Sequence, residues 1–216
     1  WWFGSGVHPL WWLTWLAPLP VLWLAPRVHA RWAALAAFVA YAAGGFNQWS
    51  YLHDYIGIPM TTIVPAIGGP ALALVLVVLL HRRLLSQGQT LAAALAPATL
   101  WVALEYVSSR LSPHGTFGNI AYTQMDALPV IQVAAVTGLW GISYLLLLLP
   151  SALVVQVSPR ATRRGRFSAG AAALLLGAAA LGYGSWRLQV PATSTLRVGL
   201  LSLEKPIRPA LDSDAG

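Results

Sequence analysis

The sequence contains no cysteine, and Lys205 is its only lysine. Without cysteine the chain has no disulfide framework, no thiolate metal site and no cysteine nucleophile. Charged residues make up only 9% of it, whereas soluble domains carry roughly a quarter. Hydrophobic residues reach 57% of the 216 residues, which is more than a soluble fold of this size can bury. The apolar segments are continuous runs, and we predict an all-α polytopic membrane protein.

Six apolar runs are long enough to cross a bilayer, which takes roughly 20 residues of helix. They span 8–25, 32–52, 61–81, 90–108, 130–156 and 168–187. Pro18 and Pro20 predict that the first run is short or bent. Pro65 and Pro70 flank a Gly-Gly pair near the start of the third run, and they predict a broken or re-entrant entry.

The composition changes abruptly after Trp186, where the chain becomes polar. We therefore predict a transmembrane helical bundle over 1–187, followed by a different unit over 188–216. A short apolar run from Leu196 to Leu203 is typical of a buried strand. Because one strand needs partners for its backbone groups, we expect it to begin an extracytoplasmic domain that this chain does not continue. The chain also starts without methionine, and we expect both ends to be cut from a longer protein.

The basic residues indicate the orientation in the membrane. Eight of the thirteen lie in the turns that follow the first, third and fifth runs. These eight are Arg27, Arg31, Arg82, Arg83, Arg160, Arg163, Arg164 and Arg166. Cytoplasmic loops are enriched in Lys and Arg, so we predict that these turns are cytoplasmic. Loops 53–60 and 109–129 and the C-terminal segment are then extracytoplasmic. Since topology accounts for the net charge of +7, nucleic acid is not an expected partner.

The stretch from Trp101 to Tyr144 is the main polar interruption in the chain. Trp101 and Glu105 are four residues apart, so they share one helix face, and Arg110 follows within two turns. A glutamate near the end of a membrane helix is costly unless it is paired or hydrated. Two interpretations remain open at this point. Glu105 either marks an interfacial helix end or a structural pair with Arg110, or it takes part in recognising a substrate or a lipid headgroup.

Several motifs in order along the chain carry a resemblance to a known family. They are HPLWWLTWLAPLPVLWLA (8–25), WVALEYVSSR (101–110), GTFGNIAYTQ (115–124), QVAAVTGLWGIS (132–143) and LRVGLLSLEKP (196–206). The second is similar to a W-x-x-x-E-[WY]-x-x-x-R helix end, and the third to a loop that closes in G-Y-S-Q. In this combination the chain resembles bacterial apolipoprotein N-acyltransferase, whose membrane bundle carries an extracytoplasmic nitrilase-like domain. Over 188–216 the resemblance implies a linker and the first strand of that α/β domain.

The resemblance implies a location in the bacterial inner membrane and a two-step acyl transfer. A cysteine, assisted by a glutamate base and a lysine, takes an acyl chain from a phospholipid and passes it to the N-terminal amine of a lipoprotein. Nucleophile and base must lie within hydrogen-bond reach, and we expect this triad beyond Gly216. We therefore assign no catalytic residue, metal ligand or cofactor to this chain.

The expected role of this chain is to anchor the catalytic domain and to form a lateral lipid entrance. The residues expected to line or brace that entrance are Trp101, Glu105, Arg110, Tyr122 and Gln124. Its expected partners are the phospholipid donor, the lipoprotein acceptor and membrane lipids.

Two other functions compete with this interpretation. The chain is alternatively the membrane anchor of another carbon–nitrogen hydrolase-like enzyme, or a small transporter or lipid-binding bundle. A transporter usually shows inverted repeats or ionisable residues at mid-span. The sequence shows no such repeat, and its ionisable groups gather near the ends of the apolar runs, which disfavours a transporter.

Overall fold

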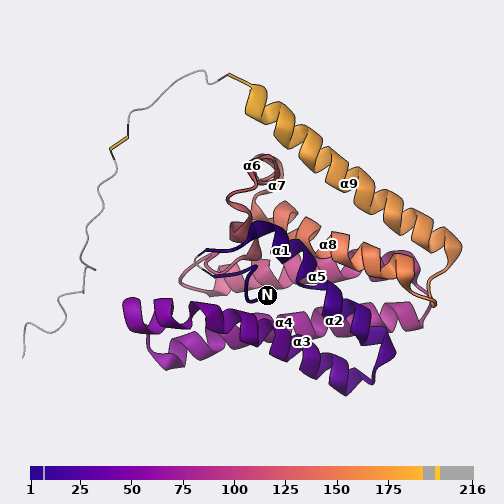
Figure 1. Ribbon diagram of the computed structural model, residues 1–216, viewed down its shortest axis with the longest axis horizontal. Helices are drawn as coiled ribbons and strands as arrows, with labels where there is room; N and C mark the ends of the chain where they lie inside the picture. Colours follow the sequence, from indigo (N-terminus) through magenta and orange to yellow (C-terminus); the bar gives the residue numbers. More distant parts are fainter. Residues whose placement is uncertain (7, 192–197, 200–216) are drawn as a thin grey trace, which may run out of the picture.

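The protein is described by a computed structural model that covers residues 1–6, 8–191 and 198–199. Within these residues all of the regular secondary structure is helical. The helices form an elongated bundle (Figure 1). The all-α prediction is therefore confirmed for the described part of the chain. The strand predicted over 196–203 lies outside the described residues, apart from Val198 and Gly199.

The helices follow one another with short connections over most of the chain. The α-helices are α1 (Trp11–Leu16), α2 (Leu19–Leu24), α3 (Ala30–Gly45), α4 (Met60–Ser86), α5 (Thr90–Leu111), α6 (Leu128–Ile131), α7 (Ala134–Thr137), α8 (Leu139–Val157) and α9 (Arg163–Gln189). Shorter helical turns are η1 (Ala25–Arg27), η2 (Phe46–Gln48), the π-helical η3 (Ser50–Tyr55) and η4 (Ile120–Gln124).

Four of these helices, α4, α5, α8 and α9, are long and apolar enough to cross a membrane. The chain is thus a helical membrane protein by length and composition, although six spans were expected. The first expected span is divided into α1 and α2, because Pro18 occupies the N-cap of α2 and Pro20 follows in its first turn. The second ends as an α-helix at Gly45 and continues only as the turns η2 and η3.

The prediction of a broken entry to α4 is wrong, because this helix runs without interruption through Pro65 and Pro70. Each proline removes only one backbone donor. In lipid, continuing the helix is the way to satisfy the other backbone groups. The break occurs instead in the fifth run, at Gly138, whose φ of 63° separates α7 from α8. This left-handed conformation favours glycine, and it explains why the long helix begins at Leu139.

The long helices pack in chain order: α3 against α4, α4 against α5, α5 against α8, and α8 against α9. They alternate in direction (Figure 1), so the connections gather at two ends of the bundle. We call one the arginine end, formed by the turns at 25–29, 87–89 and 158–162. The other, the cavity end, is formed by the segments 46–59 and 112–138.

Helix α8 lies at the centre of the bundle and α9 at its edge. Of the most apolar stretch of α8, 61% of residues are buried, against 17% for α9. Leu146, Leu147 and Leu148 are completely buried, whereas Leu174 and Leu175 of α9 are 75% and 71% exposed. So many exposed apolar side chains would be unfavourable in water, and the outer face of α9 is therefore suited to contact with lipid.

Helix α9 approaches the rest of the bundle closely at Gly184. A Cβ at this position would collide with the backbone carbonyl of Pro129 in α6. Gly182 lies two residues earlier on the same helix. A Cβ added there would have no neighbouring atom within 4 Å. The two glycines therefore differ in packing while sharing the same helical backbone.

This difference predicts opposite effects of the same substitution. Gly182→Ala is expected to be neutral or stabilising by up to ~1 kcal/mol, because alanine has the higher helix propensity. Gly184→Ala is expected to destabilise the bundle by ~1–3 kcal/mol through overpacking. Melting temperatures of the two variants in detergent measure this, and equal melting would contradict the close α6–α9 contact.

Candidate functional site

A cavity of about 680 Å³ lies at the cavity end of the bundle. Three parts of the chain that are distant in sequence line it: the N-terminal segment 1–10, α3 with η2, and the segment 117–126. Asn47 fixes the first of these, since its Nδ2 donates to the carbonyl oxygens of Trp2 (2.7 Å) and Ser5 (2.9 Å). The hydroxyl of Thr14 donates to the carbonyl oxygen of Gly4 at 2.5 Å. The N-terminal segment is therefore a fixed wall of the cavity.

The opposite wall begins at η4, which α5 and α8 hold in place through side chains. Glu105 of α5 accepts a hydrogen bond from the backbone N–H of Ile120 at 3.1 Å. Asn119 caps η4 by accepting from the N–H of Ala121 at 2.8 Å. The same Asn119 oxygen also accepts from the hydroxyl of Ser143 in α8 at 3.0 Å. These three bonds position the start of η4 against the bundle.

Several polar atoms around Glu105 remain without a hydrogen-bond partner. Trp101 Nε1, Glu105 Oε2 and Asn119 Nδ2 are all buried and unpaired among the residues that the structure describes. The side chains of Trp101, Asn119 and Ser143 lie beside the Glu105 carboxyl. Buried polar groups are nearly always hydrogen-bonded in native proteins. The two donors lie beside the one acceptor, so these side chains stabilise one another within the cluster.

Aromatic side chains pack behind the cavity. Trp1 stacks on Trp101 with ring centroids 6.5 Å apart, and Tyr41 of α3 contacts both, at 4.8 Å from Trp1 and 5.7 Å from Trp101. Trp1 and Tyr41 line the cavity, whereas Trp101 is fully buried beneath them. Such aromatic contacts are worth roughly 0.5–1.5 kcal/mol each beyond their buried area. They attach the N-terminal segment to α3 and α5.

Gln124 is completely buried and holds η4 to α1. Its Oε1 accepts from Trp15 Nε1 at 2.8 Å, and its Nε2 donates to the carbonyl oxygen of Trp11 at 3.0 Å and to Thr123 Oγ1 at 2.9 Å. With these bonds both ends of the amide are satisfied. Gln124 does not line the cavity, and its place in the structure is that of a brace.

Tyr122 lines the cavity, is 43% exposed, and shares a hydrogen bond with Thr116 at 2.7 Å. Arg110 is exposed at the end of α5 and lies outside the cavity wall. Within the described part of the chain it forms no ion pair with Glu105. The structure therefore brings Trp101 and Glu105 together behind η4, places Tyr122 at the cavity and Gln124 below it, and leaves Arg110 apart.

Sequence reasoning missed three residues of this site: Tyr41, Asn119 and Ser143. Only Asn119 carried a local signal, because an asparagine after glycine in a loop is a common N-cap. Among the residues that the structure describes, no group of three or more His, Cys, Asp or Glu side chains comes together to hold a metal ion.

This protein is a helical integral membrane protein, because four of its helices are apolar and long enough to cross a membrane. Its bundle has a cavity with polar walls at one end. Residues 1–152 match the family model described as the apolipoprotein N-acyltransferase N-terminal domain. Because this match covers most of the sequence, the chain belongs to the apolipoprotein N-acyltransferase family.

A curated relative agrees with this assignment. The chain is similar to the apolipoprotein N-acyltransferase of Geobacter metallireducens, with 30% identity over 153 residues. The alignment covers 67% of this chain but only 28% of the relative, so the chain spans less than a third of that protein's length. No solved structure matches the chain.

Proposed function

We propose that this chain is the membrane part of an apolipoprotein N-acyltransferase, which transfers an acyl chain from a phospholipid to the N-terminal amine of a lipoprotein. The observation that carries the proposal is the family match over residues 1–152. In this reaction a glycerol ester of the phospholipid is broken and an amide is formed on the lipoprotein. The products are a lysophospholipid with a free hydroxyl and a lipoprotein with one more acyl chain.

The covalent step needs a nucleophile that this chain does not contain, since it has no cysteine. We assign that step to a nitrilase-like domain on the extracytoplasmic side, and to this chain the binding of the lipid. The cavity supports this division, because its walls carry both apolar and polar side chains, including Tyr41, Asn119 and Tyr122. An acyl ester has the same mixed character.

Each predicted site residue has a place in this proposal. Tyr122 contacts the lipid at the cavity, and Glu105 and Gln124 hold η4 so that the wall keeps its shape. Trp101 supports the aromatic floor. Arg110, exposed at the same end, attracts the phosphate of a lipid at the membrane surface.

We further propose six spans in the bacterial inner membrane, with α1–α2 as the first and α3 as the second. The arginine end is then cytoplasmic, because eight of the thirteen basic residues lie there.

Residues 1–216 contain no cysteine, so this orientation can be tested by labelling single cysteines introduced there, with the unsubstituted protein as the labelling background. Gln87 and His114 are both exposed, at the arginine end and the cavity end respectively. A membrane-impermeant maleimide added to whole spheroplasts is expected to label His114→Cys and not Gln87→Cys. The reverse pattern would overturn the proposed orientation.

The reaction is tested with the gene product at its natural length, reconstituted in vesicles whose phospholipids carry isotope-labelled acyl chains. A synthetic lipopeptide with a diacylglyceryl-cysteine at its N-terminus serves as the acceptor. Mass spectrometry is expected to show the lipopeptide gaining one labelled acyl group, matched by labelled lysophospholipid. A lipopeptide with an acetylated N-terminus, which cannot accept an acyl chain, serves as the negative control. The proposed function would be refuted if the free lipopeptide, like this control, gained no labelled acyl group.

A further inference from the structure

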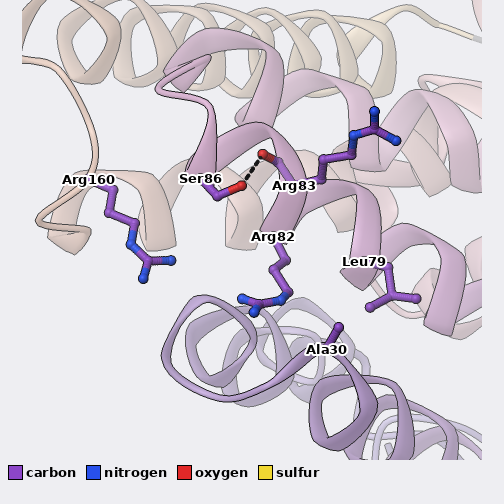
Figure 2. Close-up of a pocket in the computed structure, with 6 residues that line it drawn as sticks. All are labelled: Ala30, Leu79, Arg82, Arg83, Ser86 and Arg160. Atoms are coloured by element: carbon purple, nitrogen blue, oxygen red, sulfur yellow. Dashed lines mark hydrogen bonds between the residues drawn. The ribbon is translucent and has the colours of Figure 1, made fainter.

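A second cavity, of about 630 Å³, lies at the arginine end of the bundle, far from the site described above. It is lined by Ala30, Leu79, Arg82, Arg83, Ser86 and Arg160. Figure 2 shows that these residues come from different parts of the chain: the end of α4, the start of α3 and the turn before α9. Arg82 and Arg160 extend toward the same region in that view, while Arg83 points away from them. We call this the arginine pocket.

Within the described residues, most N–H groups of the three guanidinium groups in the arginine pocket form no hydrogen bond. Arg82 Nη1 donates to the carbonyl oxygen of Ala25 at 3.2 Å, which uses one of its five N–H groups. Arg83 and Arg160 are exposed, and neither has a side-chain hydrogen bond or an ion pair within the described part of the chain. Ser86 completes the polar lining, and its hydroxyl donates to the Arg83 carbonyl oxygen at 2.7 Å.

No carboxylate neutralises this charge among the described residues of the arginine end. The acidic side chains that the structure describes, Asp54, Glu105 and Asp126, belong to η3, the second half of α5 and the segment after η4. The guanidinium groups of Arg82 and Arg160 extend toward one region of the pocket, and Arg83 adds a third positive charge at its edge. Positive charge without a neighbouring carboxylate favours an anion. Guanidinium forks are suited to phosphate oxygens, because they bind them through two parallel hydrogen bonds.

The same end of the bundle carries the features of a membrane–water boundary. Trp23 and Trp32 are 47% and 52% exposed. The guanidinium of Arg27 lies 3.9 Å from the ring centre of Trp23, and that of Arg31 lies 5.5 Å from Trp32. Exposed tryptophans and arginines are concentrated where a membrane protein meets the lipid headgroups. These features support placing the arginine pocket near the headgroup phosphates.

The surface that leads from the pocket toward the middle of α4 is apolar. Leu72, Leu76, Leu79 and Arg83 recur at intervals of three or four residues, so they share one face of this helix. Leu72 and Leu76 are 58% and 51% exposed. An acyl chain lying along these leucines would have its phosphate at the end of α4, where Arg82 and Arg83 lie. A free phosphate ion would gain nothing from this apolar stripe.

From the charge, the lining and this stripe, we propose that the arginine pocket binds the phosphodiester headgroup of an anionic phospholipid. The bound lipid lies in the leaflet that faces the arginine end and connects α4 to the turn at 158–162. It is distinct from the acyl donor, whose proposed site is at the opposite end of the bundle. The proposal does not depend on the acyl-transfer reaction.

The test measures how anionic lipid stabilises the protein at its natural length in neutral detergent. Ligands that bind the folded state raise the melting temperature according to their affinity. Phosphatidylglycerol is the probe, with phosphatidylcholine and inorganic phosphate as comparisons. Arg82→Gln/Arg160→Gln removes the two charges that extend toward the same region of the pocket, and Arg163→Gln/Arg164→Gln removes two charges from the same end outside it.

The apparent affinity for phosphatidylglycerol is expected to fall about tenfold or more in the pocket variant and less than about twofold in the control. Phosphatidylcholine and inorganic phosphate are expected to give little stabilisation. Equal losses in both variants, or no loss in the pocket variant, would overturn the proposal. So would a shift with inorganic phosphate as large as that with the lipid. Should the double variant fail to fold, Arg160→Gln alone, in an exposed turn, is expected to weaken binding about fivefold.

Discussion

Replacing Glu105 with alanine is expected to lower acyl transfer by the natural-length protein about tenfold or more. The substitution leaves the N–H of the buried Ile120 without its acceptor, which costs ~1–3 kcal/mol. Because η4 forms a wall of the cavity in which we propose that the lipid binds, its displacement is expected to change where the lipid ester lies. Displacements of about 1 Å in a substrate-positioning element reduce rates by up to roughly a hundredfold.

Glu105→Gln separates positioning from charge, because glutamine retains an oxygen that can accept from Ile120. This variant is expected to keep its activity within about threefold of the wild type, since a neutral acceptor makes a similar net contribution. Hydrogen exchange at the Ile120 amide gives a readout that needs no activity. Protection should fall in the alanine variant and persist in the glutamine variant. If both variants lose activity alike while protection persists, the carboxylate charge itself is required, and the positioning role is wrong.

Replacing Gln124 with leucine is expected to destabilise the bundle by about 2 kcal/mol or more, because it leaves buried polar partners unpaired. Leucine has a similar size but neither accepts from Trp15 nor donates to Trp11 and Thr123. In a chain of this length such a loss lowers the melting temperature by roughly 4–8 °C. The midpoint of thermal unfolding in detergent measures the effect.

Tyr122→Phe is the matched control, two residues away in the same turn. It removes one exposed hydrogen bond, to Thr116, and surface substitutions of this kind stay within about 0.5 kcal/mol. The control is therefore expected to melt like the wild type. If Gln124→Leu also melts like the wild type, the bonds between η4 and α1 contribute nothing to stability, and the brace described for Gln124 is wrong.

The sequence predicts the long helices well because their signal is local. The runs at 61–81, 90–108 and 168–187 correspond to α4, α5 and α9, whose bounds differ by only a few residues. The length of a continuous apolar run can be read from the sequence without knowing what the helix packs against. In the fifth run the prediction of one continuous helix fails at a single residue. Gly138 ends α7 with a positive φ, and nothing in the surrounding apolar pattern distinguishes it from Gly141, which lies within α8.

The candidate site was only partly predictable, because its geometry depends on contacts between distant residues. Trp101 and Glu105 were identified from their spacing on one helix, and the structure does place them together. Asn119 and Ser143 are 24 positions apart, and Tyr41 meets Trp101 from another helix. No periodicity connects such residues. The N-terminal segment, which shows no regular pattern, was not expected to form a wall of the cavity.

The contacts of the first two helices constrain the order in which the bundle is assembled during synthesis. Helices α3, α4 and α5 each pack against the helix before them, so they can associate as they enter the membrane. By contrast α1 and α2 pack on α8, and Trp15 is bonded to Gln124, 109 positions later. Contacts of such long sequence separation form late. The packing of α1 and α2 on α8 therefore forms only after α8 is inserted, whereas the contacts of the N-terminal segment with α3 and η2 can form earlier.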